Sequence, residues 1–507
     1  MENLWRSLNS KLAMEKLYRA GRLLTLMIFL YSRCISAAMI TKMTSLPPLI
    51  VLPIPSQAQL QWQQREVIMF LHFGMNTFTD REWGSGAEDP RLFNPSSLNA
   101  SQWVSVAKQL GISLVILTAK HHDGFCLWPS AYTDHSVSKS PWKRGKGDVV
   151  GELAKAAQKQ GIELGMYLSP WDEHDPTYGN TLLYSQYYMG QLRELLTGYG
   201  HVSEIWFDGA KGKNAPDMKY MFKTWFAMAH QLQPSINIFS DAGPDVRWVG
   251  NENAACGSTC WSLFNTSHAR IGVGANPELL NSGDPHGVNW VPPECDVSIR
   301  PGWFWHEHEQ PKKPEELLAH YYTSVGRNCV LLLNVPPNSS GLISTEDINV
   351  LATFKQMRDA IFGSELASKS TTRILASSYR GPPFHPLSII DGRRDTFWAA
   401  AQGHKHGAIT LTFAHPLIFN VVELKEPIEL GQRVAKYVVK VKENGRWKLF
   451  TSGTTIGYRK LDRNCTVNAT HVELVIQKSR GEPLLSTFAL YHDSISSRLS
   501  SCSSSSV

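Results

Sequence analysis

Hydrophobic and polar positions follow two different patterns along this chain, and the first runs from about residue 62 to residue 363. Short apolar runs alternate there with longer segments in which apolar residues recur at helical spacing. The pattern predicts strands at 67–71, 112–118, 162–168, 203–209, 236–241 and 329–334, and helices at 96–110, 149–160, 184–199, 218–233, 315–328 and 350–361. The predicted strands are apolar throughout, as parallel strands covered on both faces must be.

Alternation over about 300 residues is typical of a (β/α)8-like barrel of the TIM type. An open doubly wound sheet is the alternative, but no G-x-G-x-x-G follows a predicted strand and no P-loop motif occurs. The segment 243–301 is rich in glycine and polar residues and predicts a long irregular region. We therefore expect an α/β barrel domain over residues 62–363, with some helices irregular or missing.

The second pattern begins at residue 364 and indicates a separate domain. Short runs of alternating hydrophobicity lie at 408–413, 421–424, 436–441, 447–450 and 472–476, with turns such as Asn444-Gly445 between them. This pattern predicts an antiparallel β-sandwich over 364–493. The stretch from Asp391 to Trp398 (DGRRDTFW) resembles a turn of discoidin-like domains, which either bind sugars or brace a catalytic domain. The Ser-rich end, 494–507, predicts a disordered tail.

The amino-terminal region has the features of a secretory signal. An apolar run from Leu23 to Tyr31 follows basic residues and precedes Ser36, Ala37 and Ala38, so we expect a signal peptide over 1–38 and a Pro-rich linker over 39–61. The run is too short to span a bilayer, although an uncleaved anchor or a start at Met14 is an alternative. Five glycosylation sequons agree with a secreted, extracellular protein: Asn99, Asn265, Asn338, Asn464 and Asn468.

Composition narrows the classes of partner. The net charge is +6 over 507 residues without any Lys/Arg-rich run, so we expect no nucleic-acid partner. The chain is rich in aromatic residues, which form cores but also line sugar-binding clefts. Cys256 and Cys260 are close enough to bridge a loop, whereas a zinc site would need a second pair at ligand spacing, and the sequence has none. We expect no metal or other cofactor.

Five predicted strands end on polar side chains, and in a barrel all these ends converge on one face. The residues are His72, His121 with His122, Tyr167, Asp208, and Ser240 with Asp241. Imidazoles, a phenol and carboxylates with few cations suit a polyhydroxylated sugar better than a phosphate. A metal site at His121-His122-Asp123 is disfavoured because neighbouring side chains in a strand point to opposite faces. The segment 306–309 (HEHE) meets the same objection and predicts a solvated loop.

The motifs around these residues carry a resemblance to a known family. In order they are HFGMNTF, LTAKHHDGFCLW, GMYLSPWDEH, EIWFDGA, RWVGNE and LLLNVPPN. They resemble the α-L-fucosidases of glycoside hydrolase family 29, most closely the secreted plant members, over about residues 62–361. The resemblance implies a retaining hydrolase that acts on terminal α-1,3/1,4-linked L-fucose by double displacement.

The resemblance also implies roles for particular residues. Asp208 aligns with the nucleophile, and the residues His72, His121, His122, Tyr167, Trp206 and Arg247 align with the substrate-binding set. Glu252 follows Asp208 by about 44 residues, the spacing of the acid/base in the linkage-specific subgroup, and Glu294 is the second choice. The physical requirement is independent of the family, because a retaining enzyme needs two carboxyl groups about 5 Å apart, one ionised and one protonated.

Two other functions fit parts of the sequence. A fucose lectin on the same barrel would keep the sugar-binding residues but needs neither carboxyl group. A structural cell-wall glycoprotein would bind through its sandwich. The sequence leaves open whether the substrate is a Lewis-a-type epitope of an N-glycoprotein, a xyloglucan side chain or a free oligosaccharide, and it leaves the oligomeric state open.

Overall fold

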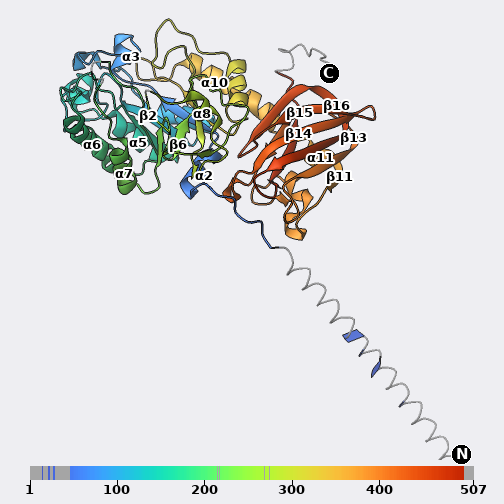
Figure 1. The fold of residues 1–507 in the computed structure, drawn as a ribbon. Helices are drawn as coiled ribbons and strands as arrows, with labels where there is room; N and C mark the ends of the chain where they lie inside the picture. Colours follow the sequence, from blue (N-terminus) through green and yellow to red (C-terminus); the bar gives the residue numbers. More distant parts are fainter. Residues whose placement is uncertain are drawn as a thin grey trace, which may run out of the picture.

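A computed structural model describes residues 46–495 except 214, 216, 268 and 273, together with six isolated positions between 14 and 28. Most of the predicted signal peptide and the tail after Ile495 therefore lie outside the described residues. Two domains follow one another along the chain, a barrel coloured blue to yellow and a β-rich domain coloured orange to red (Figure 1). Within the described residues, no helix is both long and apolar enough to cross a membrane.

The first domain is a closed barrel of eight parallel strands, which confirms the predicted fold class. Around the barrel the strands are β1 (Val67–Leu71), β2 (Leu114–Lys120), β3 (Glu163–Leu168), β4 (Glu204–Trp206), β5 (Asn237–Ser240), β6 (Val246–Trp248), β9 (Pro293–Ser298) and β10 (Val330–Asn334). The strands β6 and β9 lie inside the segment predicted to be irregular. Neither strand shows an apolar pattern in the sequence. The strand β6 has only three residues, and the inward positions of β9 carry the carboxylic acids Glu294 and Asp296.

Helices cover the outside of the barrel. They are α3 (Met75–Thr79), α4 (Ala100–Gln109), α5 (Val149–Gln160), α6 (Thr181–Gly198), α7 (Phe222–Leu232), α8 (Pro277–Ser282), α9 (Pro314–Thr323) and α10 (Thr345–Phe362). The helix α2 (Gln57–Gln64) instead packs Trp62 against the barrel interior. Local signals set the helix ends: the Asp148 side chain accepts a hydrogen bond from the amide of Gly151 at the start of α5, and Gly161 ends it with a φ of 70°. Between β5 and β9 no long helix intervenes, and a two-stranded antiparallel sheet of β7 (Leu263–Phe264) and β8 (Asn289–Trp290) fills part of the gap.

The second domain is built on an antiparallel sheet. After α11 (Ala367–Ser370) come β11 (Thr371–Ala376), β12 (Trp398–Ala399), β13 (Gly407–Lys425), β14 (Val434–Glu443), β15 (Arg446–Gly453), β16 (Lys460–Ser479), β17 (Leu484–Leu485) and β18 (Thr487–Tyr491). The main sheet has the order β11-β13-β16-β14-β15, with β18 on β13, and β12 pairs with β17. Trp398, the last residue of the discoidin-like motif, is fully buried in this domain's core.

Glu66, at the entrance to β1, ties the two domains together. Its carboxylate lies 2.5 Å from Arg459 and 3.3 Å from Arg394 of the second domain, and it accepts a hydrogen bond of 3.0 Å from the Tyr321 hydroxyl. These partners overcome the effect of burial and lower the pKa of Glu66 to about 2. The predicted linker also lies against the second domain, because Arg433 and Arg480 donate to the carbonyls of Leu49 and Leu52. The second domain thus braces the strand that leads to His72.

Candidate active site

The strand-end side chains predicted from the sequence form one continuous cluster at the carboxyl ends of the barrel strands. The rings of His72 and His121 lie 5.7 Å apart, those of His121 and Tyr167 also 5.7 Å, and those of Tyr167 and Trp206 5.5 Å. The hydroxyl of Tyr167 then donates a hydrogen bond of 3.0 Å to Oδ2 of Asp208. The four strands β1 to β4 therefore bring these side chains together.

Asp208 follows β4 and is held at both carboxylate oxygens. Its Oδ1 accepts a hydrogen bond of 2.7 Å from the amide of Ala210, and its Oδ2 accepts the bond from Tyr167. Burial and the negative charge of Asp208 raise the pKa of Tyr167 well above its usual value, so the phenol stays protonated as a donor. The Asp208 side chain remains 25% exposed, which leaves it accessible to a ligand.

The three histidines are neutral hydrogen-bonding groups rather than cations. Burial lowers the pKa of His72 to about 3 and that of His121 well below its usual value. It also lowers the pKa of His122, although the charge of Asp208 opposes this. The prediction that His121 and His122 point apart is wrong: both follow the end of β2, where strand alternation no longer applies, and their rings lie 4.0 Å apart.

Hydrogen bonds fix the tautomers of His72 and His122. Nδ1 of His72 lies 2.9 Å from Oδ1 of Asn334, whose amide nitrogen donates to Ser298 and to the Trp303 carbonyl, so Nδ1 is the protonated nitrogen. Nδ1 of His122 lies 2.7 Å from the Ser169 hydroxyl, which itself donates to the Trp171 carbonyl. Both Nε2 atoms are then acceptors. Nε2 of His122 is 4.0 Å from Oδ2 of Asp208, so a sugar hydroxyl can bridge the two.

Glu252 lies in the loop after β6, with its side chain reaching solvent. Partial burial raises the pKa of Glu252, and the negative charges of Asp208 and Glu82 raise it further. A hydrogen bond from Trp303 lowers this pKa but does not cancel the rise. Glu252 is thus electrostatically coupled to Asp208 and holds its proton to a higher pH than an ordinary glutamate.

Glu294, the other candidate acid, is enclosed near the amino ends of the strands. Glu294 is fully buried, and its Oε1 accepts a hydrogen bond of 2.7 Å from the Trp206 indole. The neighbouring Glu204 accepts a hydrogen bond from the Trp62 indole. The remaining oxygens, Oε1 of Glu204 and Oε2 of Glu294, have no other hydrogen-bond partner among the described residues, so one shared proton satisfies both. The geometry favours Glu252 over Glu294 as the group that meets a substrate.

The buried acid pair gives a test by stability. Burial raises the pKa of Glu204 to about 7, so between pH 4.5 and 7 the folded protein keeps a proton that the unfolded chain releases. Stability must then fall as pH rises through this window, by at most about 1.4 kcal/mol per pH unit for one proton. We expect Glu204→Gln to reduce this loss, measured as urea midpoints at pH 5 and pH 7.5. Glu278→Gln, at an exposed position, is the control, and an unchanged slope in Glu204→Gln would contradict the shared proton.

Arg247 is not on the substrate side of the barrel wall, and its predicted binding role is corrected. The side chains of its neighbours Val246 and Trp248 belong to the barrel interior, so Arg247 points outward by strand alternation. Its guanidinium is fully buried and donates to the backbone carbonyls of Leu280, Val291 and Trp261. Arg247 therefore holds the irregular segment between β6 and β9 in place.

The structure adds site residues that the sequence did not reveal. Trp303 and Phe304, in the loop after β9, lie 5.1 Å and 5.4 Å from the ring of His72. Glu82 fixes this loop, because its carboxylate accepts from the amides of both residues at 2.9 Å and 3.1 Å and pairs with His306 at 2.8 Å. The solvated-loop prediction is therefore wrong for His306, whose side chain is only 15% exposed. The clustered aromatics at 303–305 were the available signal.

Asp241 and Ser240 lie at the end of β5, as predicted, but are engaged with the protein. The Asp241 carboxylate accepts a hydrogen bond of 2.7 Å from the amide of Gly272. Burial and the negative charge of Asp208 raise the pKa of Asp241 to about 6. The Ser240 hydroxyl donates to the Gly243 carbonyl. A cavity of about 1290 Å³, lined by Gly209, Tyr220 and Ala242 among others, adjoins this side of Asp208.

A closed barrel that presents an accessible carboxylate, a second carboxyl of raised pKa and neutral imidazoles at its strand ends defines a glycoside hydrolase. The α-L-fucosidase family model matches residues 54–357, and the F5/8 type C domain model matches residues 370–488. The chain therefore belongs to the α-L-fucosidase family. Membership of a hydrolase family removes the support for a lectin or a purely structural glycoprotein.

Relatives match over almost the whole chain. The chain is 52% identical to α-L-fucosidase 1 of Arabidopsis thaliana, and the match covers 93% of this chain and 94% of that protein. The solved structure of SpGH29 is 41% identical with a TM-score of 0.84, covering 88% of this chain and 100% of that one. A Ruminococcus gnavus family 29 fucosidase in complex with fucose is 32% identical with a TM-score of 0.83, covering 89% and 97%.

The contacts of Glu82 predict a kinetic effect at a distance from the carboxylates. We expect Glu82→Ala to lower kcat/KM for an aryl fucoside about tenfold, the effect of losing about one charge-assisted hydrogen bond, because the Trp303–Phe304 loop loses its anchor. The matched control is Glu307→Ala, an exposed residue of the same loop. Wild-type kinetics in Glu82→Ala would show that the loop is held by other contacts.

Proposed function

We propose that this enzyme is a retaining α-L-fucosidase that hydrolyses terminal α-1,3/1,4-linked L-fucose from Lewis-a-type epitopes or related oligosaccharides. The observation that carries the proposal is the pairing of Asp208, oriented by Tyr167 and the Ala210 amide, with Glu252, whose pKa is raised partly by the charge of Asp208. One carboxyl is placed to attack and the other to hold a proton, as double displacement requires.

The first step forms a covalent intermediate. An oxygen of Asp208 bonds to the anomeric carbon while the glycosidic bond breaks, and the Glu252 proton passes to the departing oxygen. In the second step the Glu252 carboxylate takes a proton from water, the water oxygen bonds to the anomeric carbon, and the ester bond to Asp208 breaks. The fucose leaves with the configuration that it had in the substrate.

Fucose recognition is proposed for the uncharged groups around Asp208. The free Nε2 atoms of His72 and His122 accept hydrogen bonds from sugar hydroxyls, and His121 and the Tyr167 phenol complete the polar side. Trp206, stacked on Phe239 at 3.8 Å, forms part of an apolar wall for the C5 methyl group. A Ruminococcus gnavus relative has been solved in complex with fucose, which supports fucose as the sugar bound here.

The rim of the site offers a surface for the neighbouring sugar. Trp171 stacks on His122 at 4.5 Å, and Trp83, which is 67% exposed, lies 6.4 Å from Trp171. The exposed indole of Trp83 and the half-buried indole of Trp171 suit the C–H face of a pyranose in the leaving group. We therefore place the branched remainder of the substrate against Trp83 and Trp171.

Two substrates and one product analysis test the function. Release of fucose from a Lewis-a trisaccharide with little release from a 4-nitrophenyl α-L-fucoside would support the linkage-specific assignment, and α-fucose as the first product in NMR spectra would support retention. Release mainly from the aryl compound would contradict the linkage assignment, and β-fucose as the first product would contradict double displacement.

We also propose that the enzyme is secreted and N-glycosylated. Asn99, Asn464 and Asn468 are exposed, whereas Asn265 and Asn338 are half-buried. The first three are therefore the favoured acceptors. A mass decrease after N-glycosidase treatment of protein from a secretory host tests this, and glycan-free peptides at all five positions would contradict it.

A further inference from the structure

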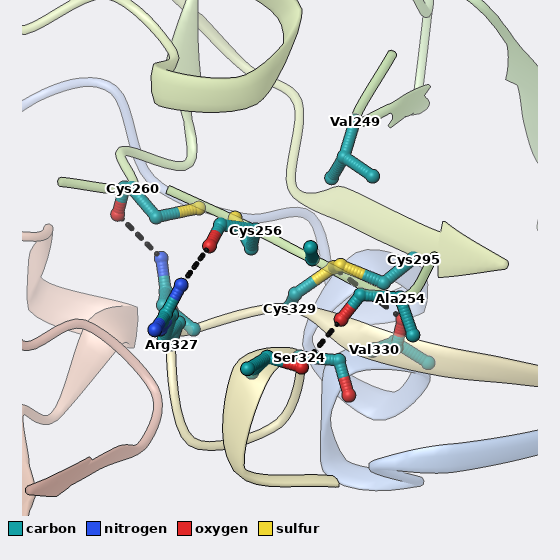
Figure 2. The surroundings of a disulfide bond; sticks show 12 residues. Val249, Ala254, Cys256, Cys260, Cys295, Ser324, Arg327, Cys329 and Val330 are labelled. Carbon is teal, nitrogen blue, oxygen red and sulfur yellow. Dashed lines mark hydrogen bonds between the residues drawn. A yellow bond between two sulfur atoms is a disulfide. The ribbon is translucent and has the colours of Figure 1, made fainter. Parts of the chain in front are cut away.

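Four cysteines meet on the outer side of the barrel wall. Cys295 of β9 and Cys329, directly before β10, form a disulfide that joins neighbouring strands (Figure 2). Cys256 and Cys260, in the loop that carries Glu252, lie beside it, and both are free thiols rather than bridged to each other. The sulfur atoms of Cys256, Cys295 and Cys329 all lie within 4.8 Å of one another. A free thiol thus stands within reach of both sulfurs of a disulfide.

Backbone contacts hold Cys256 in this place. Its carbonyl accepts a hydrogen bond of 2.7 Å from the Arg327 guanidinium (Figure 2). Its amide donates a hydrogen bond of 3.0 Å to the Thr323 carbonyl. All four cysteines are at most 4% exposed, so reagents from solution do not reach them in the folded protein. The disulfide Cys295–Cys329 is therefore the reaction partner at hand for the Cys256 thiol.

Of the two neighbouring thiols Cys256 and Cys260, Cys256 is the one that keeps its proton. Burial raises the pKa of Cys256 well above its usual value, and its thiol is hydrogen-bonded to Cys260. Burial would raise the pKa of Cys260 as well, but this hydrogen bond and the positive charges of Arg247 and Lys460 lower it. Because the thiolate is the form that attacks disulfides, the exchange starts with deprotonation of Cys256 and is accelerated at alkaline pH.

We propose that Cys256 is the attacking thiol of an internal thiol–disulfide exchange, so that the disulfide Cys295–Cys329 can be replaced by one from Cys256 to Cys295 or to Cys329. The new sulfur–sulfur bond forms as the old one breaks, and the departing sulfur takes up the proton released by Cys256. One disulfide and two thiols are present before and after, so no external oxidant or reductant is consumed. The exchange would tether the Glu252 loop covalently to a barrel strand.

The proposal is tested by trapping each alternative bond. Trypsin separates the cysteines onto peptides 248–270, 271–312 and 328–355, because Arg270, Lys312 and Arg327 precede cleavable bonds. Cys329→Ser leaves Cys295 with Cys256 as its neighbour, and Cys295→Ser leaves Cys329. Both variants are made in a secretory host, whose disulfide donors accept the two electrons that the new bond releases. The protein is quenched in acid, alkylated while denatured, freed of N-glycans and mapped by mass spectrometry.

In the Cys329→Ser protein, we expect most of peptide 248–270 to be cross-linked to peptide 271–312. In the Cys295→Ser protein, we expect most of peptide 248–270 to be cross-linked to peptide 328–355. Success of either trap identifies the sulfur that Cys256 attacks. Wild-type protein incubated at pH 9 should show a Cys256 cross-link beside Cys295–Cys329, and this needs no substitution. Cys126→Ser, which removes a buried thiol elsewhere, should leave the wild-type pattern unchanged.

Alkylated, unlinked Cys256 in both trap variants and in the wild-type protein at pH 9 would overturn the proposal. Stoichiometric zinc with no Cys295–Cys329 bond would overturn it too, because the three sulfurs would then be metal ligands. An effect of the tether on fucosidase turnover would rest on the proposed role of Glu252. The peptide map does not depend on that role, so the two proposals fail separately.

Discussion

Asp208→Gly is expected to lower kcat for aryl and natural fucosides by more than about 10³-fold, which corresponds to about 4 kcal/mol of activation free energy. The reason is chemical, since no other carboxylate is held by Tyr167 and the Ala210 amide at the end of β4. Steady-state rates measure the loss. Thermal unfolding should change little, because Asp208 belongs to a partly exposed loop and not to the barrel core.

A small anion provides the control for this variant. Azide can occupy the space of the missing carboxylate and attack the anomeric carbon from the same face, which gives a fucosyl azide of inverted configuration. Tyr167→Phe should lose less activity than Asp208→Gly, because it removes one hydrogen bond and keeps the nucleophile. Wild-type turnover in Asp208→Gly would reject Asp208 as nucleophile.

The sequence predicted those parts of the fold that depend on apolar burial. Six of the eight barrel strands are apolar runs, and their pattern was sufficient to predict a barrel. The strands β6 and β9 were missed because Arg247, Glu294 and Asp296 break that pattern. Each of these charged groups is satisfied by partners far away in sequence: Arg247 by carbonyls, Glu294 by Trp206 and Asp296 by Trp248. Tertiary contacts of this kind leave no local signal.

The same distinction holds for the site. His72, Tyr167 and Asp208 could be predicted because strand ends of a barrel must converge. Trp303 is held near His72 by Glu82, more than 200 residues away, which binds its amide, and by Asn334, which donates to its carbonyl. That Arg247 points out of the barrel follows only once β6 is recognised as a strand. Its position in the motif alone therefore predicted a substrate-binding role, which was wrong. The sequence thus identified the side chains that the barrel strands position, and it missed those, such as Trp303, that contacts between loops position.

Glu252→Ala should show a loss that depends on the leaving group. We expect kcat/KM to fall by about 10² to 10⁴ for a Lewis-a trisaccharide, whose departing hydroxyl needs a proton, and far less for an activated aryl fucoside, which does not. Added azide should give a fucosyl azide of retained configuration here, because Asp208 still forms the intermediate. The opposite configurations from Glu252→Ala and Asp208→Gly would separate the acid/base from the nucleophile.

The pH dependence gives the same residue a second test. Because the pKa of Glu252 is raised above 4.5, the protonated acid should persist to higher pH than an ordinary glutamate, and kcat/KM should fall as pH rises through that pKa. We expect this alkaline limb for the wild-type enzyme on the Lewis-a trisaccharide, and we expect Glu252→Gln to lack it on the same substrate. Glu294→Gln is the comparison, because its buried carboxyl supports Trp206 and should affect stability without changing the dependence on leaving group. Leaving-group dependence in Glu294→Gln and none in Glu252→Ala would reverse the assignment and place the proton donor inside the barrel.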